Sequence, residues 1–68
     1  MFSEEAVSII NSIIEFGKYR KGIIRVYFPD GETFQDISAQ QAAQMDFKDF
    51  LEIAVKLDGK SFVKIDVE

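Results

Sequence analysis

The sequence predicts a single two-layer α+β domain with the element order helix, strand, strand, helix, strand. Three observations predict this fold class. The chain has 68 residues, enough for one small domain. Segments with helically spaced apolar residues alternate with short β-branched segments, and a Pro-Asp-Gly tripeptide separates two of the latter. Hydrophobic residues make up 47% and charged residues 29% of the chain, a balance typical of globular domains rather than disordered ones.

The first element is expected to be a helix from Ser3 to Phe16. Ser3 is placed to cap it, and two glutamates follow in the first turn, where the helix dipole favours acidic side chains. The apolar residues recur at spacings of three and four, the pattern of one helix face. They are Ala6, Ile9, Ile10, Ile13, Ile14 and Phe16. Gly17 is expected to end the helix in the left-handed conformation.

Residues 23–28 and 32–37 are expected to form a β-hairpin. The first segment is rich in β-branched and aromatic residues. Pro29, Asp30 and Gly31 each suit one position of a tight turn, with Gly31 taking the positive φ that ends it.

A second helical segment is expected over residues 38–57, followed by a strand over residues 61–67. Ser38 and Gln41 match a capping box at its start. The apolar stripe drifts near Asp46, where a second cap would divide the segment into a short and a longer helix. The sequence leaves a continuous helix and a divided one both open.

The strands are expected to form a three-stranded mixed sheet in the order 2-1-3, with two helices on one face. The turn makes the first two strands antiparallel, and a right-handed crossover places the third beside the first and parallel to the second. Alternation directs one set of side chains towards the helices: Ile24, Val26, Phe28, Phe34, Val63, Ile65 and Val67. The other set faces away: Ile23, Arg25, Tyr27, Thr33, Gln35, Ile37, Phe62, Lys64 and Asp66.

The sheet face turned away from the helices is the predicted contact surface. It mixes aromatic and isoleucine side chains with cations, and no further element is expected to cover it, which is typical of an interaction surface. Domains this small are marginally stable, so self-association as a homodimer is also expected. We therefore interpret the protein as a non-catalytic protein-interaction or regulatory module, of the kind that phages and mobile elements use as accessory proteins. The predicted partner-binding residues are Ile23, Arg25, Tyr27, Ile37, Phe62 and Lys64.

A basic segment in an otherwise acidic chain supports an alternative function, single-stranded nucleic-acid binding. The formal net charge is −4, yet residues 18–25 contain four basic residues and no acidic one. Cations interleaved with aromatic rings can hold phosphates and stack bases. The residues of this alternative site are Lys18, Tyr19, Arg20, Lys21, Arg25 and Tyr27. Protein binding is preferred because the acidic remainder of the chain repels phosphate.

Histidine and cysteine are both absent, which removes the usual general base, thiolate chemistry and the commonest transition-metal ligands. The serines have no histidine to activate them, and no phosphate-cradling glycine pattern is present. We therefore expect no enzyme activity, no cofactor and no metal site, with Asp46, Asp49 and Glu52 forming a solvated acidic edge. No apolar run is long enough to span a bilayer and the first residues do not resemble a signal peptide, so a cytoplasmic location without membrane contact is expected.

Two further features have structural interpretations. Met45, Phe47 and Phe50, at helical spacing, are interpreted as core residues that pack against the sheet, with a groove for a partner helix as the alternative. Charges on the two outer strands are interpreted as protection of the free sheet edges against pairing: Lys60, Lys64 and Asp66 on the third strand, and Glu32 and Asp36 on the second.

Overall fold

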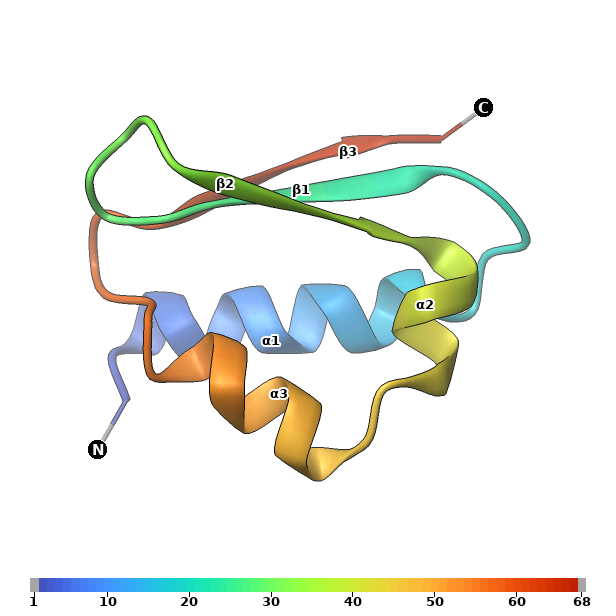
Figure 1. Cartoon of the computed structure of the whole chain (residues 1–68), viewed down its shortest axis with the longest axis horizontal. Coiled ribbons are helices and arrows are strands. Elements are labelled where there is room, and N and C mark those ends of the chain that lie inside the picture. Colours follow the sequence, from blue (N-terminus) through green and yellow to red (C-terminus); the bar gives the residue numbers. More distant parts are fainter. Residues whose placement is uncertain (1, 68) are drawn as a thin grey trace.

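The computed structural model describes residues 2–67, which form a three-stranded sheet and three helices (Figure 1). The elements are α1 (Glu4–Phe16), β1 (Ile23–Tyr27), β2 (Phe34–Ser38), α2 (Ala39–Gln44), α3 (Phe47–Ala54) and β3 (Phe62–Asp66). The strand order β2-β1-β3 is the predicted one. β1 pairs antiparallel with both neighbours. The sheet is therefore antiparallel and not mixed, because the two parallel strands, β2 and β3, are not neighbours.

Helix α1 begins at the predicted cap and ends differently from the prediction. The Ser3 hydroxyl accepts a hydrogen bond from the N–H of Ala6 at 3.1 Å. Gly17 has a right-handed backbone with φ of −63°, and the left-handed residue is Gly22 with φ of 114°. A Cβ on Gly17 would lie 3.0 Å from the backbone nitrogen of Ala43. The close approach of α2, rather than a positive φ, therefore requires glycine at this position.

The turn after β1 has the predicted geometry. The N–H of Gly31 donates to the carbonyl of Phe28 at 3.0 Å, which places Pro29 and Asp30 at the two central positions of the turn. Gly31 has φ of 77°. The prediction for this tripeptide is confirmed.

The hairpin loop is nevertheless longer than predicted: the N–H of Phe28 donates to the carbonyl of Thr33 at 3.0 Å, so four residues, 29–32, lie between this pair instead of the predicted three, 29–31. The Asp30 carboxylate accepts hydrogen bonds from the N–H groups of Glu32 and Thr33, at 2.9 and 2.8 Å, which keeps Glu32 in the loop. Tyr27 consequently lies opposite Phe34. A shift of one residue in register moves each side chain of a strand to the other face. The predicted orientation of the second strand is therefore wrong.

The register shift exchanges Phe34 and Ile37 between the two faces. Ile37, a predicted contact residue, is 3% exposed in the core, whereas Phe34, a predicted core residue, is 46% exposed on the opposite face. Gln35 lies opposite a buried residue of β1 and thus on the helix side of the sheet, not on the predicted outer face. Ile65 and Val67 are also not buried as predicted, and each is about half exposed. Their position explains this, because β3 is an edge strand and Val67 lies beyond its end.

The second helical segment is divided in two, as a cap at Asp46 predicts. Ser38 and Gln41 form the predicted capping box at the start of α2. Asp46 and Asp49 form a second capping box at the start of α3. Met45, between the two helices, has an extended backbone conformation. Reciprocal side chain–backbone hydrogen bonds therefore fix where each helix begins.

The core lies between the sheet and the helices. Its largest fully buried side chains are Phe16, Ile13, Ile24 and Val26. Figure 1 shows α1, α2 and α3 on the same side of the sheet. Within residues 2–67, the opposite side of the sheet has no helix or strand over it.

Candidate functional site

The first candidate site is the outer face of the sheet, the side turned away from the helices. Directly opposed residues of antiparallel strands share a face, so the register arranges the outer face in three rows across β2, β1 and β3. The rows are Phe34–Tyr27–Phe62, Asp36–Arg25–Lys64 and Ser38–Ile23–Asp66. The outer face thus brings together all the predicted partner-binding residues except Ile37. It also contains Phe34, which was predicted to lie in the core, and Asp36, which was interpreted as edge protection.

An aromatic row, Phe34–Tyr27–Phe62, forms one end of the outer face. The rings of Tyr27 and Phe62 are stacked, with centroids 4.5 Å apart and an interplanar angle of 13°. Phe34 is tilted against Tyr27 at a centroid distance of 5.7 Å. Phe34 and Phe62 remain 46% and 45% exposed. The three rings therefore support each other while a large part of their apolar area stays in contact with solvent.

The central row is held by an ion pair. Arg25 Nε donates to Asp36 Oδ1 at 2.7 Å, and Arg25 Nη2 donates to Asp36 Oδ2 at 3.1 Å. The hydrogen bond to Asp36 raises the pKa of Arg25, and Arg25 in turn lowers the pKa of Asp36 below its ordinary value. The guanidinium lies 4.1 Å from the ring centroid of Phe34, and Lys64 Nζ lies 5.5 Å from that of Tyr27. Both cations therefore lie over aromatic rings, an arrangement that holds them close to the sheet.

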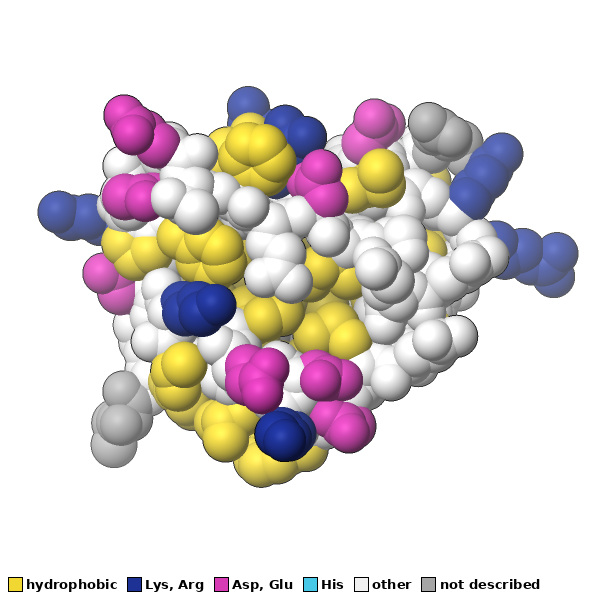
Figure 2. All heavy atoms as spheres, in the orientation of Figure 1, with side chains coloured by type: hydrophobic (Ala, Val, Ile, Leu, Met, Phe, Trp, Pro, Cys, Tyr) yellow, Lys and Arg dark blue, Asp and Glu magenta, His cyan; other side chains and the backbone are white. Residues whose placement is uncertain are grey.

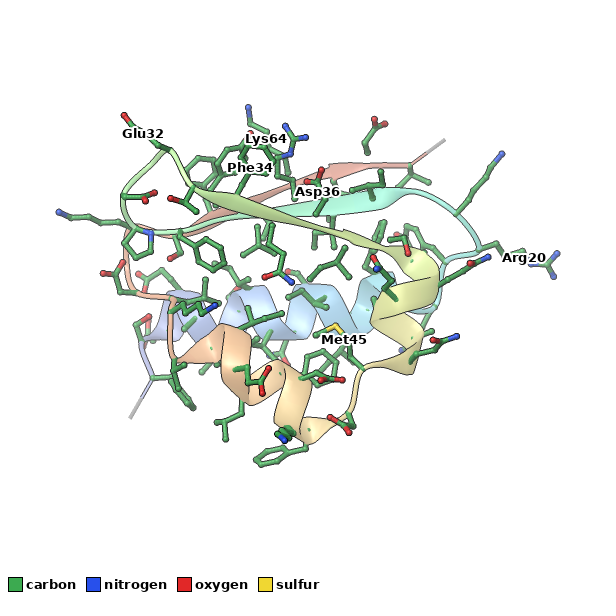
Figure 3. All side chains as sticks on the ribbon, viewed as in Figure 1. Arg20, Glu32, Phe34, Asp36, Met45 and Lys64 are labelled. Atoms are coloured by element: carbon green, nitrogen blue, oxygen red, sulfur yellow. The ribbon has the colours of Figure 1, made fainter. Side chains whose placement is uncertain are left out.

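The other end of the outer face is a shallow depression of about 360 Å³. Its lining residues are Ile23, Arg25, Asp36, Lys64, Ile65 and Asp66. Its two cations and two carboxylates balance, so the depression has no net formal charge. Figure 3 shows Phe34, Asp36 and Lys64 projecting on the same side of the sheet.

The structure separates the predicted basic segment from the aromatic row. Residues 18–21 lie in the connection between α1 and β1, and Figure 3 shows Arg20 at one end of the molecule, away from the labelled outer-face residues. Tyr27 ends β1, about 13 Å from Ile23 at the start of the strand, at a rise of about 3.3 Å per residue. Lys18 Nζ lies 3.3 Å from Glu15 Oε1. Lys18, Tyr19, Arg20 and Lys21 therefore lie before the start of β1, whereas Tyr27 lies at its end.

A second apolar surface lies on the helix side of the molecule, in a groove of about 260 Å³ between α1 and α3. Its lining residues are Phe2, Ala6, Val7, Ile10, Asn11, Ile14, Phe47, Phe50, Leu51 and Ala54. Met45 and Phe50 pack against the core as predicted, but Phe47 is 80% exposed. Figure 2 shows hydrophobic side chains gathered at the lower edge of the molecule, over α3. The interpretation of Phe47 as a core residue is therefore wrong, because helical spacing does not show which residues of an apolar stripe face solvent.

The acidic residues at the start of α3 are engaged in helix capping. Asp46 Oδ1 accepts from the N–H of Asp49 at 3.0 Å, and Asp49 Oδ2 accepts from the N–H of Asp46 at 3.1 Å. Among residues 2–67, no three acidic side chains are arranged to hold a metal ion. Every buried side-chain polar atom of the described part has a hydrogen-bond partner.

Comparison with known proteins adds no functional information. No protein-family model, curated protein or solved structure matches the chain. No helix within residues 2–67 has both the length and the apolar character needed to cross a membrane. The function must therefore be inferred from the surfaces of the molecule itself.

Proposed function

We propose that this protein is a non-catalytic protein-interaction module that binds a protein partner with the outer face of its sheet. The observation that carries this proposal is the aromatic row. Its three rings are in contact across all three strands, and two of them are nearly half exposed. Aromatic residues and arginine are enriched at the centres of protein interfaces, where they contribute most of the binding energy. The proposal includes the regulatory role and the cytoplasmic location expected from the sequence.

The arrangement of the outer face before binding supports this proposal. Arg25 is held by two hydrogen bonds to Asp36, and Tyr27 is stacked on Phe62. Ordering a flexible side chain on binding costs about 0.5–1.5 kcal/mol. Binding to side chains that are already held in place therefore costs less free energy than binding to flexible side chains such as free lysines.

The charges of the outer face favour a protein with a flat, largely apolar surface. Arg25 and Lys64 are balanced by Asp36 and Asp66 on the same face. Nucleic-acid binding depends on cations that neutralise phosphates. A phosphate that bound Arg25 would compete with the Asp36 carboxylate. Single-stranded nucleic-acid binding is therefore the alternative, and protein binding is preferred.

Photocrosslinking at three phenylalanines tests the proposal. Phe34 and Phe62 lie on the outer face, and Phe47 at the α1–α3 groove is the matched control. Each is replaced in turn by p-benzoylphenylalanine, and cells that produce the protein are irradiated. We expect protease-sensitive adducts from positions 34 and 62 and few from position 47. Random collisions would instead favour position 47, because Phe47 is 80% exposed.

The pattern of adducts distinguishes the alternatives. Adducts of twice the monomer mass would identify a second copy of the chain as the partner. Nuclease-sensitive adducts from positions 34 and 62 would support the nucleic-acid alternative. Adducts from position 47 alone would assign binding to the α1–α3 groove and refute the proposal for the outer face.

A further inference from the structure

β3 is an open edge of the sheet. It pairs with β1 on one side, and no residue in the range 2–67 pairs with it on the other. Such a strand exposes backbone N–H and C=O groups that can pair with another strand. Ile65 is 51% exposed in this strand, and Val67 just beyond it is 52% exposed. The edge therefore combines free backbone groups with apolar side chains in contact with solvent.

A hollow of about 490 Å³ lies beside the β3 edge, on the helix side of the sheet. Its lining residues are Glu4, Val7, Ser8, Asn11, Ser12, Glu15, Phe16, Tyr19 and Ile65. Because these residues extend from the first turn of α1 to beyond its last turn, the hollow follows the length of the helix. Alternate residues of a strand added beside β3 would point towards the helices and into this hollow. The molecule thus has room for a fourth strand at this edge.

We propose that a second copy of this chain pairs with β3 through its own β3, antiparallel, so that two sheets join into one. A twofold axis perpendicular to the sheet keeps both helix layers on the same side. Residues directly opposite each other in such a pair share a face, so the axis lies midway between one residue of β3 and the same residue of the second copy. The central candidates are Val63, Lys64 and Ile65. This inference uses a different surface from the aromatic row and does not depend on the proposed function.

Charge complementarity selects the register centred on Ile65. In this register Lys64 lies opposite Asp66 of the second copy, twice by symmetry, while Ile65 meets its own copy and Val63 meets Val67. Opposite charges placed across two strands are stabilising, and like charges are destabilising. The register centred on Lys64 places two lysines opposite each other. The register centred on Val63 gives Asp66 an opposite charge at Lys60, but it places Lys64 opposite Phe62 and leaves Ile65 and Val67 without aliphatic partners, so charge and apolar matching together favour Ile65.

The same charges were interpreted from the sequence as protection against edge pairing. A charge on an edge strand discourages pairing where it meets an apolar or like-charged residue. Lys64 lies opposite Arg25 of β1, so it has a like-charged neighbour within its own chain. Asp66 of the second copy would supply the opposite charge. Lys64 and Asp66 therefore select one register of pairing rather than prevent pairing.

Charge exchange at positions 64 and 66 tests the inference. Lys64→Asp and Asp66→Lys each place like charges opposite each other in the dimer, and we expect each to raise the dimer Kd about tenfold. An equimolar mixture of the two single variants restores both opposite-charge pairs in a heterodimer. The double variant Lys64→Asp/Asp66→Lys restores them in a homodimer. Sedimentation velocity over a micromolar to millimolar range measures each Kd.

Controls separate this effect from changes in net charge and in folding. Lys48→Asp on α3 and Glu32→Lys in the β1–β2 loop alter the net charge equally, and we expect them to leave the dimer Kd unchanged. Recovery of the dimer on mixing shows that both single variants are folded. The inference is overturned if the unmodified protein stays monomeric at millimolar concentration, or if mixing the single variants restores nothing. Phe34→Ala changes the outer face on β2, at the sheet edge opposite β3, and we expect it to leave this dimer intact while weakening contacts at the outer face, so the two proposals can fail independently.

Discussion

Ile37 should contribute more to stability than the larger Phe34, because the β1–β2 register places Ile37 in the core. Ile37 is 3% exposed and packs in the main cluster of buried side chains. Truncation of such a residue to alanine lowers the free energy of unfolding by about 2–5 kcal/mol. Full burial of a phenylalanine contributes about 1.5–3 kcal/mol. Since Phe34 is 46% exposed, roughly half of that, about 1 kcal/mol, is lost in Phe34→Ala.

Urea denaturation followed by far-UV circular dichroism measures both changes. A domain of this size has a stability of only about 3–5 kcal/mol, so Ile37→Ala is expected to lose most of its stability and to unfold at the lowest urea concentrations. Ile37→Val gives a measurable intermediate value, a loss of about 0.5–1.5 kcal/mol. A larger loss for Phe34→Ala than for Ile37→Ala would show that β2 presents its other face to the helices. That result would refute the register and, with it, the composition of the outer face.

Three further predictions concern the helices and the ion pair. Gly17→Ala should lower the free energy of unfolding by about 1–2 kcal/mol in the same urea assay, because the strain of a crowded methyl group exceeds the gain in helix propensity. Gly59→Ala, whose added Cβ would meet only ordinary contacts, should not lower stability. Asp46→Ala should cost about 1 kcal/mol, measured likewise, because α3 loses its N-cap. Arg25 lowers the pKa of Asp36 in the folded protein. The stability that their pair contributes is therefore present above the ordinary carboxyl pKa and is lost as the pH falls through the folded pKa of Asp36. An NMR titration should show a higher Asp36 pKa in Arg25→Gln than in the unmodified protein.

Features encoded by a few neighbouring residues could be predicted from the sequence. The turn at Gly31 depends on Pro29, Asp30 and the conformational freedom of glycine, all within one tripeptide. Each capping box joins residues three positions apart, so Ser38 was identified as a cap and Asp46 as a possible one. The strand order followed from connection handedness, a rule that needs only the order of elements.

The length of the β1–β2 loop decides which side chains of β2 point towards the helices, and the turn tripeptide does not determine that length. The Asp30 carboxylate accepts hydrogen bonds from the N–H groups of Glu32 and Thr33 and so holds Glu32 in the loop. The side chains of β2 that were predicted to face the helices therefore face the other side of the sheet. A signal for the correct phase was nevertheless present. Residues 34 and 36 share a face, so burying Phe34 would also turn Asp36 towards the core, where a carboxylate is costly. Placing Gln35 and Ile37 on the helix side avoids that cost.

The exposure of Phe47 depends on packing between distant segments. Helical spacing identifies Phe47, Phe50 and Leu51 as an apolar stripe, and this stripe is wider than the contact that α1 offers. The start of α3 at Asp46 rotates Phe47 to the rim of the groove, where it is 80% exposed. The sequence contains the stripe, but the angle between α1 and α3 decides which residues remain uncovered.

The capping box at the start of α3 also restricts motion at the corner between α2 and α3. Met45 is the single residue between the last residue of α2 and the cap of α3, and its N–H donates to the carbonyl of Ala42 at 3.4 Å. So short a connection leaves few backbone rotations by which α3 could swing relative to α2, and α2 is itself seated against Gly17 of α1. The short connection is therefore rigid and fixes the distance between α3 and α1. Because α1 and α3 are already held in place, a ligand that binds in the groove between them orders few additional backbone or side-chain groups.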